Sequence, residues 1–127
     1  MKVAFIGLGN MGASLAKVVA KEVAATDLLL VNRSPQKVQD FISQYGGTAS
    51  ELEQAFQEAE VIFLGVKPYQ ICPLLEEYKG ILAQRSNLLL VSMAAGLELE
   101  KMADVIQNDQ VGLIRIMPNT PVAIGQG

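Results

Sequence analysis

Short runs of consecutive apolar residues alternate along the chain with segments in which apolar residues recur every three to four positions. Runs in which almost every residue is apolar predict strands that are buried on both faces of a parallel sheet. They occupy residues 2–6, 27–31, 61–66, 88–93 and 112–117, with a fainter strand at 47–49. Because segments of helical period separate these runs, the pattern predicts an α/β fold, a doubly wound parallel sheet with helices on its faces.

Capping residues and prolines mark where the helices begin. Ser34 followed by Pro35 predicts the N-cap and the first turn of a helix. Residues 50–53, Ser-Glu-Leu-Glu, match a capping box whose serine caps the next helix. A further helix is predicted over residues 68–82, and Pro73 near its start favours a first turn later than residue 68.

A glycine-rich turn lies between the first strand and the first helix, with the sequence Gly7-Leu8-Gly9-Asn10-Met11-Gly12. In a strand–turn–helix setting, this G-x-G-x-x-G spacing is typical of dinucleotide binding. Gly7 would permit the tight turn, Gly9 would let the backbone approach a pyrophosphate, and Gly12 would let the helix pack close to the strand. The helix N-terminus would then offer unpaired N–H groups to the phosphates.

Asn32-Arg33-Ser34 follows the second strand, about twenty residues after the glycine motif, where the adenosine ribose lies in such folds. NAD-selective sites usually carry Asp or Glu there for the ribose 2′-hydroxyl. Here the carboxylate is absent, and Arg33 can bind a 2′-phosphate through charge-assisted hydrogen bonds. The segment therefore predicts NADP(H), with NAD(H) as the alternative. A simpler interpretation, compatible with the first, is that Ser34 caps a helix and Arg33 is solvated.

Two other strand ends carry candidate residues for the nicotinamide half of a cofactor. Val66-Lys67-Pro68 ends the fourth strand and Ala94-Ala95-Gly96 ends the fifth. Ligands bind at the carboxyl ends of parallel strands, and small residues at 94–96 would let the backbone reach a flat ring. Lys67 either donates to a cofactor hydroxyl or is a solvated lysine at a strand end, and the spacing favours neither.

Composition narrows the class of protein. The length of 127 residues suits one domain, and 50% hydrophobic with 18% charged residues lies in the globular range. Ten Lys and Arg are scattered among thirteen Asp and Glu, which predicts no nucleic-acid or membrane-surface partner. One cysteine and no histidine predict neither a disulfide nor a metal site. No membrane-helix or signal-peptide pattern is present, so we expect a cytoplasmic protein.

The motifs, in this order and spacing, resemble those of the pyrroline-5-carboxylate reductase family. The most specific is Arg115-Ile116-Met117-Pro118-Asn119-Thr120-Pro121, and the resemblance covers the whole chain. It implies a Rossmann-type NADP-binding domain of a reductase that passes hydride from NADPH, or less well NADH, to the C=N bond of 1-pyrroline-5-carboxylate, giving L-proline. It implies cofactor contacts at Ile6, Gly7, Leu8, Gly9, Asn10, Met11, Arg33, Ser34, Val66, Lys67, Pro68, Ala94, Ala95 and Gly96. Catalytic residues stay unassigned, with Asn119 and Thr120 as candidates at the substrate end.

Members of this family continue into a helical domain that forms the dimer and supplies much of the substrate pocket. We therefore expect residues 1–117 to be the dinucleotide-binding domain and residues 118–127 to begin the connection to that C-terminal helical domain, which is absent here. The parent enzyme would be a homo-oligomer acting on a small molecule, and this chain would be inactive or weak by itself. The alternatives are a stand-alone, non-catalytic NADP-binding or sensing module and a domain of a related imine or hydroxy-acid reductase.

Overall fold

The computed structural model describes residues 1–93 and 99–116. In this part of the chain six strands form one sheet in the order β3-β2-β1-β4-β5-β6, and all neighbours are parallel. The strands are β1 (Val3–Ile6), β2 (Leu28–Val31), β3 (Thr48–Ala49), β4 (Val61–Leu64), β5 (Leu88–Ser92) and β6 (Val111–Arg115). The order reverses between β1 and β4, so the doubly wound parallel sheet predicted from the sequence is confirmed.

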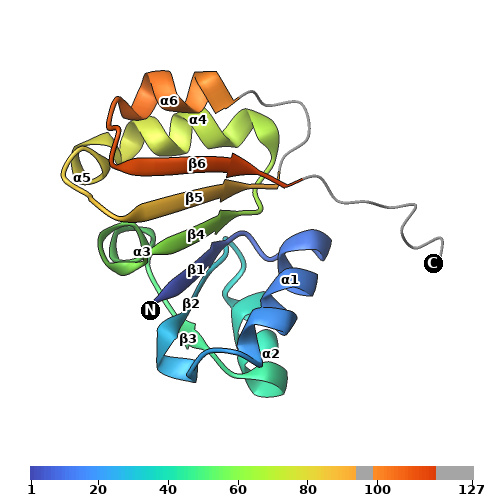
Figure 1. The fold of residues 1–127 in the computed structure, drawn as a ribbon. Helices are drawn as coiled ribbons and strands as arrows, with labels where there is room; N and C mark the ends of the chain where they lie inside the picture. The colour runs from blue at the N-terminus through green and yellow to red at the C-terminus, as the bar shows by residue number, and fades with distance from the viewer. Residues whose placement is uncertain (94–98, 117–127) are drawn as a thin grey trace.

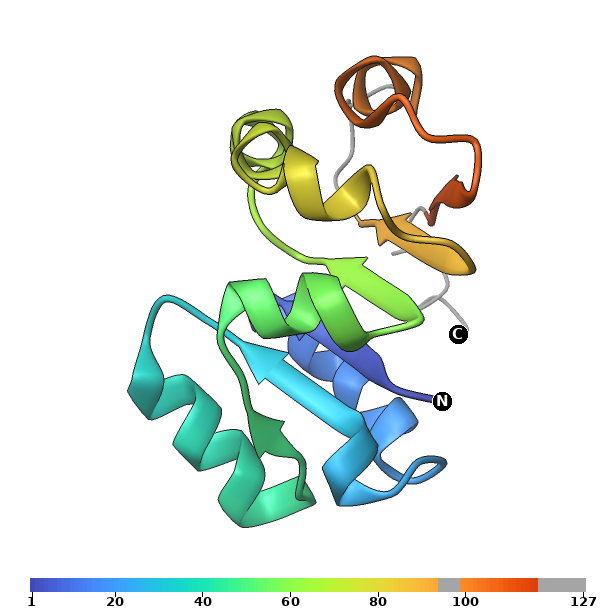
Figure 2. The same cartoon turned by 90° about the vertical axis from the view of Figure 1, so that its left-hand side faces the viewer.

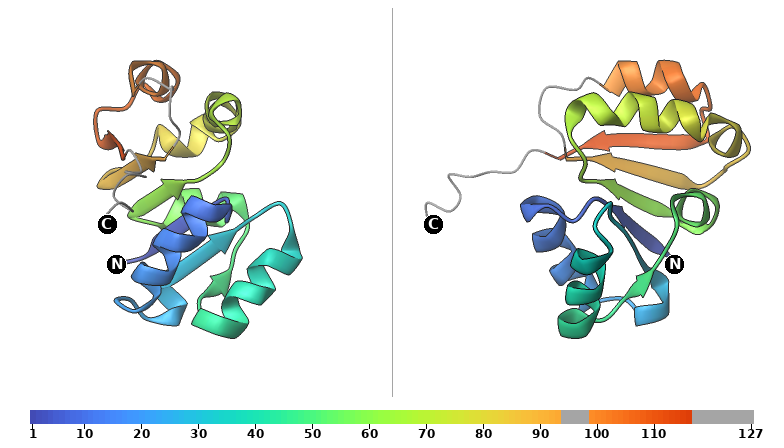
Figure 3. Two further views of the ribbon diagram at one scale, coloured as in Figure 1. Left: turned by 90° about the vertical axis from the view of Figure 1, so that its right-hand side faces the viewer. Right: turned by 180° about the vertical axis from the view of Figure 1, so that it is seen from behind.

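Helices connect successive strands. They are α1 (Asn10–Ala20), α2 (Pro35–Tyr45), α3 (Leu52–Glu58), α4 (Pro68–Glu77), α5 (Lys79–Leu82) and α6 (Leu99–Ile106), with a short 3-10 turn, η1 (Ala25–Asp27), before β2. Helices α4 and α6 lie side by side beyond β4–β6 (Figures 1 and 2). From behind, α1 and α2 pack together beside the β1–β3 half of the sheet (Figure 3).

The alternation of side chains along the strands divides the core into two layers. Val3 and Phe5 of β1 pack with α1 and α2, whereas Ala4 and Ile6 pack with helices on the opposite face. All four side chains are at most 5% exposed. A strand buried on both faces needs apolar residues at every position, which explains the continuous apolar runs in the sequence.

The predicted capping box at residues 50–53 is wrong. Helix α3 takes Glu51 as its N-cap, without a side-chain cap, and the Ser50 hydroxyl donates to the Glu51 carbonyl oxygen at 3.0 Å. The Ser50 N–H donates to the Leu30 carbonyl oxygen at 3.0 Å, which continues the pairing between β2 and β3. Ser50 therefore still belongs to the extended segment, and the helix begins one residue later than the pattern indicated.

The helix predicted over residues 68–82 starts where predicted, whereas the later first turn that Pro73 favoured is wrong. Helix α4 begins at Pro68, with Pro73 inside it, and ends at Glu77 rather than near residue 82. Proline is well tolerated at the first helical position, and the Lys67 N–H is satisfied by Gln70 Oε1 at 3.1 Å. The helix is interrupted at Tyr78, which ends α4 and precedes the short helix α5.

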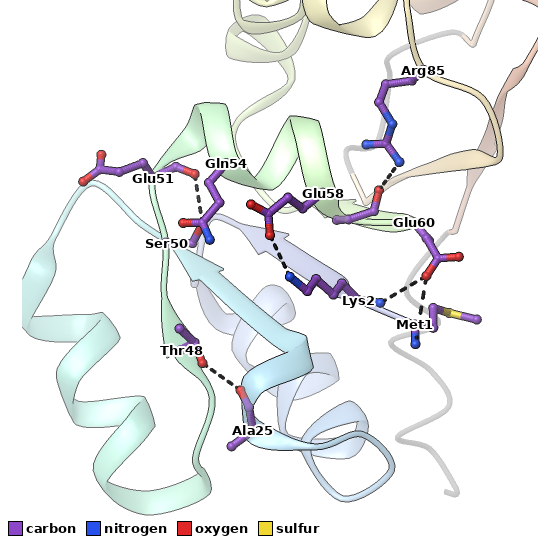
Figure 4. A network of polar contacts seen from close by, with 11 residues as sticks. Met1, Lys2, Ala25, Thr48, Ser50, Glu51, Gln54, Glu58, Glu60 and Arg85 are labelled. Atoms are coloured by element: carbon purple, nitrogen blue, oxygen red, sulfur yellow. Dashed lines mark hydrogen bonds and ion pairs between the residues drawn. The ribbon is translucent and has the colours of Figure 1, made fainter.

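A polar clamp joins α3 to the segment after α5. Arg85 donates through Nη1 to the Phe56 carbonyl oxygen at 2.5 Å and through Nη2 to the Ala59 carbonyl oxygen at 2.6 Å. Figure 4 shows Arg85 pointing toward the end of α3, where helix carbonyls lack partners within the helix. Figure 4 also draws the hydrogen bond from Lys2 to Glu58. Its length from Nζ to Oε1 is 2.7 Å, and it lowers the pKa of Glu58.

Arg85→Met is expected to destabilise the domain by about 1–3 kcal/mol, because two carbonyl oxygens lose charged donors. Urea unfolding followed by circular dichroism measures this change. Lys79→Met is a matched control, since Lys79 is exposed and its one ion pair with a described residue is a 3.9 Å contact with Glu76. Equal stability of the two variants would show that the clamp contributes nothing.

Candidate functional site

The glycine turn after β1 is built by close backbone contacts. Gly7 has φ +97°, a conformation that favours glycine, and its N–H donates to the Val31 carbonyl oxygen at 2.8 Å. A Cβ at Gly12 would overlap the Gly7 carbonyl oxygen. The predicted structural roles of Gly7 in a tight turn and of Gly12 in close helix packing are therefore confirmed.

A third glycine, Gly65 directly after β4, packs against the backbone of the glycine turn. No role was assigned to it from the sequence. Its N–H donates to the Ile6 carbonyl oxygen at 2.8 Å, and a Cβ there would lie 2.9 Å from the Gly7 carbonyl oxygen and 3.0 Å from Met93 Cε. The contact with the Gly7 backbone oxygen is too short for a side chain, whereas the flexible end of Met93 could move away. The sequence signal that could have indicated this role is the glycine inside the otherwise bulky apolar run of residues 61–66.

The N-terminus of α1 opens directly after this turn. Gly9 is the N-cap with extended backbone, makes no side-chain cap and is followed by no acidic residue in the first turn. A Cβ at Gly9 would meet nothing within 4 Å among the described residues. The first N–H groups of the helix and its dipole therefore face open space, where an anion would be stabilised.

The segment after β2 lies against the glycine turn through Asn32. Asn32 Oδ1 accepts a hydrogen bond from the Leu8 N–H at 2.8 Å, and Asn32 Nδ2 donates to the Ser34 carbonyl oxygen at 3.4 Å. The sequence placed Asn32 near the ribose but gave no sign of the bond to Leu8, which joins residues 24 positions apart.

Arg33 and Ser34 occupy the start of α2. Ser34 is its N-cap, and Ser34 Oγ accepts from the Lys37 N–H at 3.4 Å, so the capping interpretation is confirmed. The Arg33 side chain is exposed, and none of the ion pairs among the described residues involves it. Its guanidinium is thus available to a ligand.

One open groove of about 2100 Å³ runs along the carboxyl ends of the strands. Ten of the predicted cofactor residues line it: Ile6, Gly7, Gly9, Asn10, Met11, Arg33, Ser34, Val66, Lys67 and Pro68. Leu8 does not, because its side chain is 5% exposed within the core and its N–H is held by Asn32. Ala94, Ala95, Gly96, Asn119 and Thr120 lie outside the described residues.

Charge is distributed unevenly around this groove. Arg33 and Lys37 line it at the start of α2, whereas Glu51 and Glu53 line it at the start of α3. Burial raises the pKa of Tyr78, another lining residue, and nearby glutamates raise it further. A phosphate is therefore attracted to the Arg33 side and repelled from the α3 side.

These features fit a dinucleotide. The groove exceeds the roughly 300–1,000 Å³ of an ordinary small-molecule pocket. It offers an uncapped helix N-terminus, an unobstructed approach at Gly9 and a cationic side chain at Arg33. A diphosphate at the helix and a further phosphate at Arg33 match this set of donors.

Comparison with known proteins agrees with this geometry. Residues 2–96 match the protein family described as NADP oxidoreductase coenzyme F420-dependent. The chain belongs to this family. The Rossmann-type fold and the oxidoreductase class predicted from the sequence are thereby confirmed.

Individual relatives are pyrroline-5-carboxylate reductases. That of Corynebacterium melassecola is 35% identical over 98% of this chain and 47% of its own length. The structure of the Coxiella burnetii enzyme has a TM-score of 0.83, with 30% identity over 97% of this chain and 46% of its own. The Plasmodium falciparum enzyme, solved with NADP bound, has a TM-score of 0.74 and 25% identity over 98% of this chain and 45% of its own.

The resemblance to the N-terminal domain of pyrroline-5-carboxylate reductases is therefore confirmed. The chain spans about half the length of the curated relatives it matches. Among the helices of residues 1–93 and 99–116, none is long and apolar enough to span a bilayer.

Proposed function

We propose that this chain is the NADPH-binding domain of a reductase that transfers hydride to the C=N bond of 1-pyrroline-5-carboxylate, giving L-proline. One observation carries the proposal. The open N-terminus of α1 and the exposed Arg33 line the same groove, in a chain 35% identical to a pyrroline-5-carboxylate reductase over 98% of its length. The Plasmodium falciparum relative, solved with NADP bound, supports the choice of cofactor.

In this proposal the chain binds and orients the cofactor. The first-turn N–H groups of α1 hold the pyrophosphate, and Arg33 with the Ser34 hydroxyl holds the 2′-phosphate. Val66 to Pro68 would contact the nicotinamide half, and the family resemblance implies the same role for Ala94 to Gly96. The nicotinamide supplies the hydride when it is bound. A protonated imine accepts hydride readily, so the main task of the protein is to hold the two reactants in position.

The substrate side of the proposal rests on the family resemblance. Asn119 and Thr120 are proposed at the substrate end, with the cofactor domain ending at residue 117. A C-terminal helical domain of the parent enzyme would complete the pocket, form the homo-oligomer and act with this domain in the cytoplasm.

The 127 residues by themselves are expected to bind NADPH but to make proline slowly. Enzymes typically turn over at about 1–10³ s⁻¹, and half a substrate pocket cannot hold the imine against the nicotinamide well enough to reach that range. Steady-state oxidation of NADPH, with proline measured as product and a reaction without imine as control, tests this expectation. Turnover inside that range would contradict the proposal that a second domain is needed to complete the substrate pocket.

A further inference from the structure

A single side chain connects the two parts of the groove that face the phosphates. Asn32 accepts from the Leu8 N–H, inside the glycine turn, at 2.8 Å. It donates to the carbonyl oxygen of Ser34, at the start of α2, at 3.4 Å. Ser34 in turn accepts from the Lys37 N–H, so these bonds run continuously from the glycine turn to α2.

An amide at position 32 suits both of its hydrogen-bond partners. The Leu8 N–H needs an acceptor, and the Ser34 carbonyl, which as the N-cap carbonyl takes the first helical bond of α2, has a second lone pair for a donor. These two neighbours orient the oxygen and the nitrogen of Asn32. A carboxylate would keep the first bond, lose the second and add a negative charge beside Arg33. An aliphatic side chain would lose both bonds and leave the half-buried Leu8 N–H without a partner.

We propose that Asn32 is a positioning residue that holds the glycine turn and the Arg33–Ser34 segment at a fixed separation, so that one dinucleotide contacts both. The inference rests on the proposed function. A ligand with two anionic groups binds strongly only when both subsites are held at the matching distance, because the second contact is then made without a further loss of freedom. Ligands that reach only one subsite gain nothing from the connection.

Binding measurements on Asn32→Ala test this prediction. NADPH is expected to bind about tenfold more weakly, the equivalent of one or two hydrogen bonds. ADP, which carries only the diphosphate, and 2′-AMP, which carries only the 2′-phosphate, should each change by about twofold or less. The matched control is Gln36→Ala, which removes an exposed hydrogen bond to Asp40 on α2 and should leave all affinities unchanged. Equal losses for NADPH and both fragments would overturn the inference in favour of general distortion of the site.

The cofactor-free protein gives an independent readout. Amide hydrogen exchange at Leu8 should become at least about tenfold faster in Asn32→Ala. It should stay near the original rate in Asn32→Asp, which keeps the acceptor. Asn32→Asp should also retain NADH affinity within a few-fold while losing at least about tenfold for NADPH, because it adds a negative charge next to Arg33 in the same groove.

The outcomes separate the two proposals. If the unmodified chain fails to bind NADPH, the proposed function is wrong, whatever happens at Leu8. If the unmodified chain binds NADPH and Asn32→Ala binds it equally well, with unchanged exchange at Leu8, the positioning role of Asn32 is wrong and the proposed function stands.

Discussion

Gly12→Ala is expected to destabilise the domain by about 1–3 kcal/mol. The added methyl group would overlap the Gly7 carbonyl oxygen, and this oxygen cannot move freely because the Gly7 N–H is bonded to Val31 at 2.8 Å. Alanine normally stabilises a helix by up to about 1 kcal/mol relative to glycine. The expected loss is therefore the cost of the clash less this gain in helix propensity. Urea unfolding of the cofactor-free chain measures the net effect.

Two other glycines provide matched controls for this variant. Within residues 1–93 and 99–116, no atom lies within 4 Å of a Cβ added at Gly80 in α5, so Gly80→Ala should stabilise the protein by about 0.5–1 kcal/mol. Gly9 is equally unobstructed and has φ −71°, which alanine accepts. Gly9→Ala should therefore fold normally, yet bind NADPH at least about tenfold more weakly, because its methyl group stands where the pyrophosphate approaches. Full NADPH affinity in Gly9→Ala would contradict the placement of the pyrophosphate.

Arg33→Ala should weaken NADPH binding by roughly ten- to a hundredfold, since hydrogen bonds to charged groups contribute about 1.5–3 kcal/mol. NADH has only a hydroxyl at the corresponding position and should change by a few-fold at most. The structure makes this a sharp test, because Arg33 is exposed and its removal breaks no ion pair among the described residues. Calorimetric titration of both cofactors measures the two losses.

Lys101→Ala is the control for a general change in charge, because Lys101 is exposed on α6 and does not line the groove. Ser34→Ala is less informative, since it also removes the cap that the Lys37 N–H uses, at a cost of about 1 kcal/mol in stability. Equal losses of NADPH and NADH affinity in Arg33→Ala would mean that Arg33 does not recognise the 2′-phosphate.

The strands and their parallel arrangement could be predicted because burial on both faces of the sheet requires apolar residues at consecutive positions. Val3 to Ile6 are apolar at every position, and each contacts one of two helical layers. Gly7 and Gly12 could also be assigned roles, since backbone contact at a turn excludes every other residue type. In these cases the local environment restricts the residue type, to apolar residues in the strand and to glycine in the turn, so the type reveals the environment.

Features that depend on one particular side-chain or backbone contact between distant residues could not be predicted. Asn32 looks like an ordinary loop residue until Leu8 is placed beside it, and Gly65 looks like an interruption of a strand until β4 is paired with β1. Ser50 matched a capping box, but its backbone pairs with Leu30 instead. Leu8 has the right position in the motif, although its side chain belongs to the core. A local sequence pattern does not show which distant residues these four side chains or backbone groups contact in the folded protein.

Titration of the isotope-labelled chain with NADPH, followed residue by residue through its amide NMR signals, tests the central claim most directly. We expect saturable binding of one NADPH, with the largest shifts at the first N–H groups of α1, Asn10 to Gly12, and at Arg33. NADH should shift the same helix signals at roughly ten- to a hundredfold higher concentration, without the change at Arg33. Absence of saturable binding, or shifts confined to residues outside the groove, would contradict the account.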